Sequence, residues 1–308
     1  MQTIWNDDIL CLSIAQKSQE LYIPMISLTV TAPIKLNLNL HIIGVTSNHY
    51  HLLEGVTVFA TDGDNITITH NHSDTDDLII QGQFAHFLNS ENPSDNLIIK
   101  AIKLLRTIKD FPFLTLTLEK NIPIQAGYGG GSSDAAAVLK GINQLCDLNI
   151  SHHDLMMLGK SLGADVPMCV YAKPCLIHNV GDVITPLNIQ NKTYMCLLLK
   201  PDFMLATQQV FHALTHKNNP KMAKTDNPIH YALHDGRNDL FQAALHLQPK
   251  LNHYLQALLA THPIKAAMSG SGSGLFALYD NQDAFESAYD TIKKQFSENF
   301  ILKTSINL

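Results

Sequence analysis

The glycine-rich segment at residues 123–137 constrains the fold of this 308-residue chain more than any other feature. Four glycines fall within five positions, from Gly127 to Gly131, and they are followed by Ser132, Ser133 and an alanine-rich run. Glycine reaches backbone conformations that are closed to other residues, and its N–H groups can approach a ligand closely. Free N–H groups at a helix N-terminus also form an anion site. A strand, this loop and a helix at about residues 133–145 therefore predict a phosphate-binding site.

This loop differs from the two most familiar nucleotide-binding loops. A G-x-x-x-x-G-K-[ST] loop needs a lysine that this segment lacks, and Ser132 stands where G-x-G-x-x-G has its last glycine. A flexible turn is the simpler interpretation of a glycine cluster alone. The paired serines and the alanine-rich helix directly after a strand favour phosphate binding over that turn.

Composition excludes several classes of protein. With 45% apolar residues the chain can bury the core of one large domain or two moderate ones. A net charge of -6 and the lack of a Lys/Arg run argue against nucleic-acid binding, which needs a basic face. Five scattered cysteines without a C-x-x-C pair are typical of reduced thiols in a cytoplasmic protein. No run of 18 apolar residues occurs, so no membrane span is expected.

Alternating patterns predict several strands. From Ile34 to Leu40, apolar residues alternate with Lys35, Asn37 and Asn39, which places the polar side chains on one face of a strand. Residues 65–69, after an expected turn at residues 62–64, and residues 114–118 alternate in the same way. Helices are expected at residues 96–109 and 153–162, and a surface loop at residues 216–227. Strands and helices intermix without strict alternation, so the predicted fold class is α+β.

Two further segments point to the same chemistry. Asp165 lies in an otherwise apolar stretch beside Pro167, where a carboxylate is costly unless it is paired or functional. Taken alone, Asp165 is more simply explained as a turn residue at the end of a helix. Residues 268–274 form a second glycine-rich loop, alternating with serine, that runs into an apolar strand. A linker is the alternative interpretation of that loop, but a linker is not expected inside a compact domain.

These segments, in this order, resemble the three motifs of the GHMP kinase superfamily, which includes galactokinase, homoserine kinase and mevalonate kinase. Residues 33–38 are similar to the first motif, residues 127–133 to the second and residues 269–274 to the third. The resemblance implies an ATP-dependent kinase with a two-domain α+β fold. Its N-terminal domain would be ribosomal S5-like and its C-terminal domain ferredoxin-like.

Within that superfamily the chain resembles the 4-diphosphocytidyl-2-C-methyl-D-erythritol kinase family of the non-mevalonate isoprenoid pathway. The shared marks lie at residues 32–37, 50–51, 95–98, 120–123 and 162–167. They imply that ATP with Mg²⁺ phosphorylates the 2-hydroxyl of 4-diphosphocytidyl-2-C-methyl-D-erythritol in the cytoplasm, without a nucleic-acid or membrane partner. Neither the Mg²⁺ ligands nor the oligomeric state is indicated.

The resemblance also implies a domain organisation. It covers about residues 27–308, with an ATP-binding domain that carries the catalytic residues at 27–178 and a C-terminal GHMP kinase domain at 179–308. Residues 1–26 are expected to be an N-terminal extension without a motif. They lack the cationic start and apolar run of a signal peptide, so none is predicted.

Each residue that matches the family pattern acquires an implied role. Lys35 and Asp165 would meet at the acceptor hydroxyl, with Asp165 as general base and Lys35 stabilising charge. Tyr50 and Phe211 would stack on the cytosine, and His51 would form a hydrogen bond to it. The residues implied for ATP are Asn96, Lys120, Pro123, Gly127, Gly129, Gly130, Gly131, Ser132 and Ser133. Those implied for the substrate are Asn37, Tyr50, His51, Thr207 and Phe211.

The chain departs from the family pattern just before the cytosine contacts. The family shows Asp-Gly-Tyr-His, whereas this chain has Ser47-Asn48-His49-Tyr50-His51. The loss of that glycine is expected to affect the backbone conformation of the turn and, through it, the position of Tyr50. Milder departures occur at Ile34, Tyr128 and Ser269, and none removes a proposed reactive group.

Two other functions stay open from the sequence. One is a GHMP kinase of the homoserine or mevalonate type, against which the marks at residues 50–51 and 95–98 count. The other is a nucleotide-binding homologue that has lost turnover, against which the presence of both Lys35 and Asp165 counts. Histidine pairs such as His152-His153 have no carboxylate or cysteine at a convincing spacing, so no histidine-based metal site is predicted.

Overall fold

The computed structural model describes residues 27–88, 92–188 and 192–308, and the predicted extension at residues 1–26 lies outside them. Its strands are β1 (Ser27–Asn37), β2 (His41–Val45), β3 (His51–His70), β4 (Asp77–Gln81), β5 (Leu114–Glu119), β6 (Cys175–His178), β7 (Val183–Pro186), β8 (Thr193–Lys200), β9 (Lys265–Met268), β10 (Leu275–Tyr279) and β11 (Phe300–Asn307). Within the described ranges these strands form one 11-stranded sheet, with the main path β4-β5-β3-β11-β8-β10-β9. The β4–β5 pair is parallel and the other pairs of that path are antiparallel.

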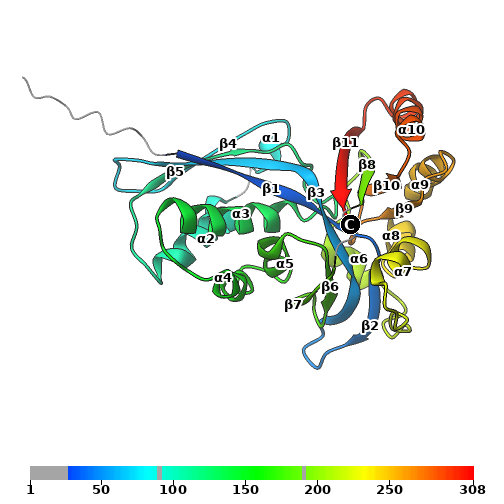
Figure 1. Ribbon diagram of the computed structural model, residues 1–308, viewed down its shortest axis with the longest axis horizontal. Coiled ribbons are helices and arrows are strands. Elements are labelled where there is room, and N and C mark those ends of the chain that lie inside the picture. The colour runs from blue at the N-terminus through cyan, green and yellow to red at the C-terminus, as the bar shows by residue number, and fades with distance from the viewer. Residues whose placement is uncertain (1–26, 89–91, 189–191) are drawn as a thin grey trace, which may run out of the picture.

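Strand β3 joins the two ends of the molecule. Its first residues pair with β2 and β6, and its later residues pair with β1 and β5. Near its middle, Ala60 pairs with Ile306 of β11, which connects β3 to the C-terminal strands. Figure 1 shows β1 and β3 running side by side from one end of the molecule to its centre. The division at residue 178 stays a prediction, since one sheet spans both parts.

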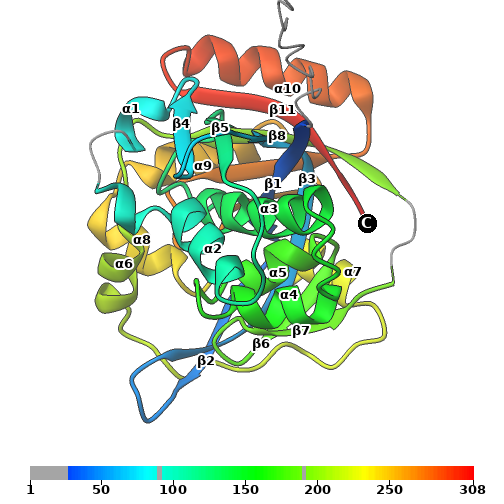
Figure 2. The same cartoon turned by 90° about the vertical axis from the view of Figure 1, so that its left-hand side faces the viewer.

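The helices cover this sheet in two groups. They are α1 (Ala85–Leu88), α2 (Leu97–Arg106), α3 (Gly130–Leu145), α4 (His152–Gly159), α5 (Val166–Tyr171), α6 (Thr207–Ala213), α7 (Pro228–His234), α8 (Phe241–Leu247), α9 (Leu251–Leu259) and α10 (Gln282–Gln295). Helix α3 packs on β1 and β3 and is flanked by α2 and α5, whereas α9 and α10 pack on the C-terminal strands (Figures 1 and 2). The mixture of a mainly antiparallel sheet with these helices confirms the α+β class. None of the helices in the described ranges is long and apolar enough to cross a membrane.

Local sequence accounts for most of these elements. In β5 the apolar residues of the Leu-Thr-Leu-Thr-Leu run are buried and the threonines are half-buried, as alternation predicts. Helix α2 begins after Asn96, whose side chain accepts a hydrogen bond from the N–H of Ile98. Helix α3 begins at Gly130, three residues before the predicted start, because two of the glycines form its first turn. Helix α4 ends at Gly159, earlier than predicted.

The turn expected at residues 62–64 is wrong, because β3 runs through it without a break. Gly63 is required there by close strand contact rather than by a turn, since a Cβ at this position would lie 1.9 Å from the carbonyl oxygen of Ala32. The neighbouring strand β1 changes register between Pro33 and Lys35 at the same place. Lys35 and Asn37, which follow this bulge in β1, line the candidate site described below.

Candidate active site

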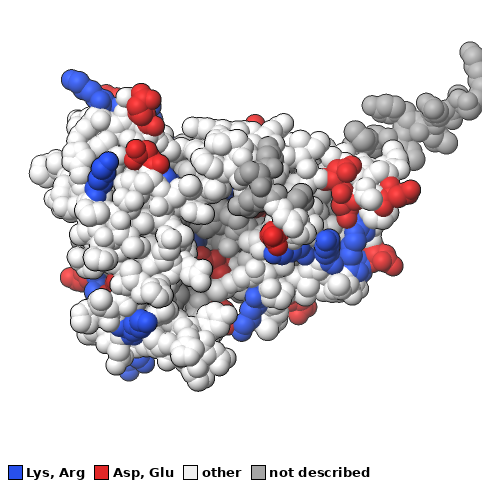
Figure 3. All heavy atoms as spheres, turned by 180° about the vertical axis from the view of Figure 1, so that it is seen from behind, with Lys and Arg blue, Asp and Glu red and all other residues white. Residues whose placement is uncertain are grey.

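A cleft of about 930 Å³ lies where β1, the starts of α2, α3 and α6, and the loops before α5 and β10 meet. Every residue that the sequence predicted for the site lines this cleft, except Ser133. The molecular face in Figure 3 is mostly uncharged, as the 16% content of charged residues predicts, and it carries no broad basic patch. A small polar ligand suits this cleft better than a nucleic acid does.

The predicted glycine-rich loop forms one wall of the cleft. Gly127 and Gly129 have φ angles of 72° and 69°, which favour glycine, and Gly129 is the N-cap of α3. A Cβ on Gly129 would lie 2.9 Å from the side chain of Lys35, and one on Gly127 would lie 2.0 Å from the carbonyl oxygen of Ser269. Both glycines therefore allow the loop to fit tightly between β1 and the loop at residues 269–274.

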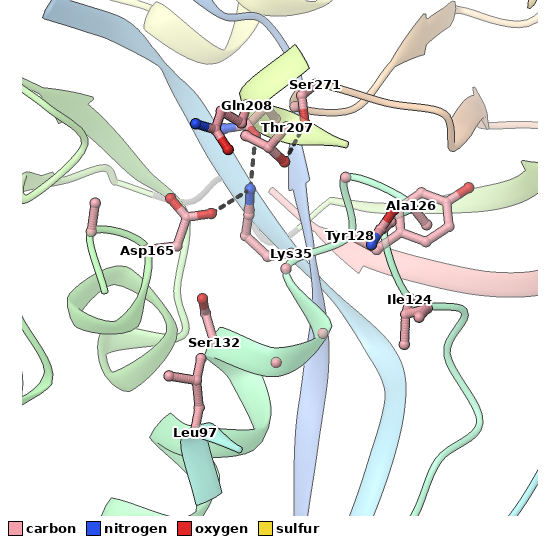
Figure 4. A pocket seen from close by; sticks show the side chains of 18 of the residues that line it. Lys35, Leu97, Ile124, Ala126, Tyr128, Ser132, Asp165, Thr207, Gln208 and Ser271 are labelled. Atoms are coloured by element: carbon pink, nitrogen blue, oxygen red, sulfur yellow. Dashed lines mark hydrogen bonds and ion pairs between the residues drawn. The ribbon is translucent and has the colours of Figure 1, made fainter. Parts of the chain in front are cut away.

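The two serines at the start of α3 have different surroundings. Ser132 is half-buried and lines the cleft near Asp165 (Figure 4). Ser133 is 1% exposed, and its hydroxyl donates a 2.7 Å hydrogen bond to the carbonyl oxygen of Pro33. Its backbone N–H donates to the carbonyl oxygen of Gly129. Both donor groups of Ser133 thus connect α3 to β1 and to the loop itself.

Lys35 and Asp165, predicted as the catalytic pair, face each other across the cleft (Figure 4). The Nζ atom of Lys35 lies 3.1 Å from Oδ2 of Asp165 and donates a 2.9 Å hydrogen bond to Oδ1 of Asn37. Lys35 is 4% exposed, whereas the Asp165 side chain is 40% exposed. The predicted polar face is therefore buried, and its residues Lys35 and Asn37 line the site, whereas Asn39 lies beyond the end of β1 and does not line the cleft. A buried ammonium beside an accessible carboxylate can stabilise charge while the carboxylate accepts a proton.

Asp165 begins a helix instead of ending one. It is the N-cap residue of α5, but its side chain makes no capping hydrogen bond and points toward Lys35. The turn at residues 163–166 is closed by a backbone hydrogen bond from Val166 to Gly163. The carboxylate of Asp165 therefore faces the cleft. A residue that only closed a turn would not need to face it.

The loop at residues 269–274 connects the other two motifs. The hydroxyl of Ser269 donates to the carbonyl oxygen of Gly127 at 2.9 Å and accepts from the N–H of Asn37 at 3.2 Å. The side chain of Asn238 donates to the carbonyl oxygens of Met268 and Gly270. These hydrogen bonds therefore hold three segments together at the cleft: β1, the glycine-rich loop and the loop at residues 269–274.

Lys120, predicted to lie near the adenine, has its side chain in a buried ion cluster beneath the glycine-rich loop. Its Nζ atom lies 2.6 Å from Oδ2 of Asp64 and 2.7 Å from Oδ2 of Asp134. Its backbone N–H donates to Gln81 and its carbonyl accepts from Phe84. The Lys120 side chain therefore packs against the inner side of the glycine-rich loop, next to Gly130. Its predicted contact with the nucleotide stays a prediction.

The residues predicted for the cytosine gather at the other end of the cleft. The rings of His51 and Phe211 lie 4.8 Å apart at 38°, and Tyr50 is 66% exposed beside them. Burial lowers the pKa of His51, and the charge of Lys217 lowers it further, so the imidazole is neutral at neutral pH. Its Nε2 atom is buried without a partner among the described residues. A neutral ring with a free nitrogen suits hydrogen bonding to an uncharged base.

The turn before Tyr50 keeps the geometry that a glycine would give. His49 has a φ of 65°, in the left-handed region that favours glycine. Two backbone hydrogen bonds close the turn, from Thr46 to Tyr50 and from His49 to Thr46. The departure from the family pattern therefore does not displace Tyr50 from the cleft.

Sequence reasoning missed several residues at the cleft. Asp134 and Asp64 complete the ion cluster, and Ser271 shares a 2.9 Å hydrogen bond with Thr207 (Figure 4). Asp134 carried a usable signal, because a carboxylate inside an alanine-rich run is costly without a partner. Gln208, which also lines the cleft, follows Thr207 in a segment without any such signal.

Comparison with known proteins agrees with this geometry. The family model described as GHMP kinases N terminal domain matches residues 96–173, and the one described as GHMP kinases C terminal matches residues 229–298. A 4-diphosphocytidyl-2-C-methyl-D-erythritol kinase of Brucella abortus biovar 1 is 38% identical over 273 residues, which cover 85% of this chain and 89% of that protein. The chain belongs to the 4-diphosphocytidyl-2-C-methyl-D-erythritol kinase family of GHMP kinases.

Further members of this kinase family are similar over nearly the same length. The kinase of that name from Mesorhizobium japonicum is 35% identical over 286 residues, which cover 90% of this chain and 95% of that protein. A crystal structure of 4-(cytidine 5'-diphospho)-2C-methyl-D-erythritol kinase matches with a TM-score of 0.76 at 25% identity, over 91% of this chain and 100% of that one. A homoserine kinase from Cytophaga hutchinsonii has a TM-score of 0.66 at 17% identity, over 91% of this chain and 95% of that one, and shows the shared fold alone. The predicted GHMP kinase fold and family are confirmed.

Mg²⁺, which ATP implies, finds no complete ligand set in the described part of the chain. No group of three or more His, Cys, Asp or Glu side chains there could hold a metal ion. Mg²⁺ commonly keeps several waters and binds through substrate phosphates with one or two carboxylates. The cleft fits an ion that arrives with the triphosphate, since Asp165 is an accessible carboxylate beside the glycine-rich loop.

Proposed function

We propose that this chain transfers a phosphoryl group from ATP to the 2-hydroxyl of 4-diphosphocytidyl-2-C-methyl-D-erythritol. One observation carries the proposal: the Lys35–Asp165 pair lies in the same cleft as both the glycine-rich loop and the His51–Phe211 ring pair. A cytidine at the rings and a triphosphate at the loop would bring the acceptor hydroxyl and the γ-phosphate together at Asp165. The family names support the substrate, because the relatives at 35–38% identity carry the name of this kinase.

In this proposal the protein acts mainly by positioning the reactants and stabilising charge. Phosphoryl transfer needs little covalent chemistry from the enzyme, and stabilisation of the charge on the moving group is the main requirement. Asp165 accepts the hydroxyl proton, and Lys35 stabilises the negative charge on the transferring phosphate. Asn37 holds the ammonium of Lys35 in place through a 2.9 Å hydrogen bond, and its own amide donates to Thr57.

The glycine-rich loop would hold the triphosphate through backbone N–H groups at the start of α3. The left-handed glycines leave these N–H groups open to the cleft, where the helix dipole favours an anion. Mg²⁺, when bound, would neutralise charge between the phosphates. The cytoplasm is the proposed compartment, and the four free cysteines of the described residues support it.

The acceptor is tested by offering ATP with a panel of alcohols. We expect phosphate transfer to 4-diphosphocytidyl-2-C-methyl-D-erythritol, detected as a new phosphomonoester by phosphorus-31 NMR, and no transfer to homoserine or mevalonate. Transfer to homoserine or mevalonate instead would contradict the proposed substrate. Nucleotide binding without transfer to any acceptor would indicate a homologue that has lost turnover.

Replacing Phe211 by alanine tests the cytosine end of the cleft. Stacking of a base on an aromatic ring contributes about 1–3 kcal/mol, so Phe211→Ala should raise the KM for the cytidine substrate by about 5- to 150-fold. The KM for ATP should change little, because Phe211 packs against His51 and not against the glycine-rich loop. Steady-state kinetics with each substrate varied in turn measures both values. Phe113→Ala, which removes a ring that stacks on Arg106 outside the cleft, is the matched control. Equal effects of Phe211→Ala on both KM values would count against the cytosine pocket.

A further inference from the structure

Three buried charges lie directly beneath the glycine-rich loop. Lys120, Asp64 and Asp134 are 1%, 0% and 3% exposed, and both carboxylates contact the same ammonium. A Cβ on Gly130, at the start of α3, would lie 3.0 Å from Nζ of Lys120. With both carboxylates ionised, the cluster carries a net charge of one negative unit (two carboxylates and one ammonium). This negative charge would therefore repel a triphosphate bound at the loop above it.

The two carboxylates are not equally stabilised. Asp64 accepts hydrogen bonds from the N–H groups of Asn121 and Ile122 as well as from Lys120. Asp134 is bonded only through Oδ2 to Lys120, and its Oδ1 atom is buried without a partner among the described residues. Asp134 also lines the cleft. An unpaired buried carboxylate oxygen is costly while it is charged, so Asp134 is the member of the cluster that gains most from a proton.

The carboxyl of Asp134 gains and loses its proton near neutral pH. Burial raises the pKa of Asp134 to about 7, repulsion from Asp64 acts in the same direction, and the Lys120 ammonium opposes both. Lys120 and Asp64 are the charged groups that face Asp134. Lys35 of β1 is directed to Asp165, and Cys169 of α5 is a neutral thiol whose pKa burial raises to about 12.

The charged residues of α2, which also packs against α3, are engaged elsewhere or lie at the surface. Arg106 forms a 2.7 Å ion pair with Asp76, and the Lys100 side chain is 44% exposed and lies near Asp95. Lys103 is exposed in the last turn of α2. The proton at Asp134 is therefore set by the cluster itself and by whatever charge enters the cleft above it.

We propose that binding of a nucleotide triphosphate at the glycine-rich loop is coupled to the uptake of one proton from solvent by Asp134. The proton binds to a carboxylate oxygen of Asp134, and the cluster changes from a net charge of minus one to zero. This inference rests on the proposed placement of the triphosphate at the loop. The free state loses the proton as pH rises above neutrality, so nucleotide affinity decreases with rising pH, on the order of fivefold across the transition.

Isothermal titration calorimetry of the full chain measures this coupling. The probe is the magnesium complex of a non-hydrolysable ATP analogue, titrated at about pH 7.5 in buffers of low and high ionisation enthalpy. The dependence of the heat on the buffer gives the protons taken up. Because Asp134 is partly protonated at this pH with and without nucleotide, we expect about 0.4 proton more for the wild type than for Asp134→Asn. Asparagine keeps the shape and leaves Lys120 paired with Asp64, but it cannot take up the proton. Asp280→Asn, which removes an exposed carboxylate, should match the wild type.

Each outcome of this experiment is decisive for one claim. No binding heat for the wild type would overturn the proposed placement of the nucleotide. Binding with equal proton uptake in the wild type and Asp134→Asn would overturn the coupling alone. Should Asp134→Asn fail to fold, the wild type is measured at about pH 7.5 and pH 9.5. The coupling predicts that uptake falls at the higher pH, where Asp134 is ionised with and without nucleotide, and uptake that is absent at both values contradicts it.

Discussion

Replacing Asp165 by asparagine should lower kcat by about 10²- to 10⁴-fold, because a positioned general base contributes a factor of that size. The amide cannot accept the hydroxyl proton at neutral pH. Nucleotide affinity should stay near the wild-type value, since the triphosphate is proposed to bind to backbone N–H groups of the glycine-rich loop, whereas the Asp165 carboxylate contacts Lys35. The effect should therefore appear in turnover and not in ATP binding.

The fold should tolerate Asp165→Asn. The side chain is 40% exposed and makes no capping hydrogen bond, so its removal leaves no buried group unsatisfied in α5. Lys35 keeps its hydrogen bond to Asn37. Single-turnover kinetics and nucleotide titration separate chemistry from binding. Asp147→Asn is a suitable control, because Asp147 is exposed outside the cleft and its φ of 47° is one that asparagine adopts readily. Unchanged turnover in Asp165→Asn would remove its role as the base.

Local patterns in the sequence predicted much of the fold and the glycine-rich wall of the cleft, whereas the resemblance indicated most of the other cleft residues. Alternation placed Lys35 and Asn37 on one strand face, and the glycine cluster predicted the loop before α3. Such patterns work where one segment carries its own physical requirement, as a left-handed φ favours glycine. The resemblance then indicated Asp165, which local composition alone would have assigned to a turn.

The parts that could not be predicted depend on contacts between distant segments. Lys120 and Asp64 are 56 positions apart, and the sequence predicts Asp64 in a turn although it lies within β3. The hydrogen bond between Asn37 and Ser269 spans 232 positions. Neither partner of such a pair carries a local signal for the other. The predicted start of α3 is also wrong, because its first turn contains glycines, which are typical of loops.

The buried cluster leads to the second large effect, a loss of stability when Lys120 is replaced by methionine. Removing one partner of a buried ion pair costs about 3–5 kcal/mol, because the remaining charge is left uncompensated. In this protein two buried carboxylates, Asp64 and Asp134, would lose the ammonium that compensates their charge. Chemical denaturation should therefore show a decrease of this size in the free energy of unfolding of Lys120→Met. Lys192→Met, which breaks an exposed pair with Asp280, should change it by less than about 1 kcal/mol.

The pH dependence of Lys120→Met separates lost charge compensation from lost packing. Burial already raises the pKa of Asp134 to about 7, and without the ammonium, which lowers it, the pKa of Asp134 in the folded variant rises further above its unfolded value. The folded variant therefore binds this proton more tightly than the unfolded state does. Stability of the variant then increases as pH falls from about 8 toward 5, and its deficit relative to the wild type shrinks. Adding Asp134→Asn should recover part of the loss in the double variant, since one uncompensated charge is removed. A deficit that is constant with pH and additive with Asp134→Asn would mean that Lys120 acts through packing alone.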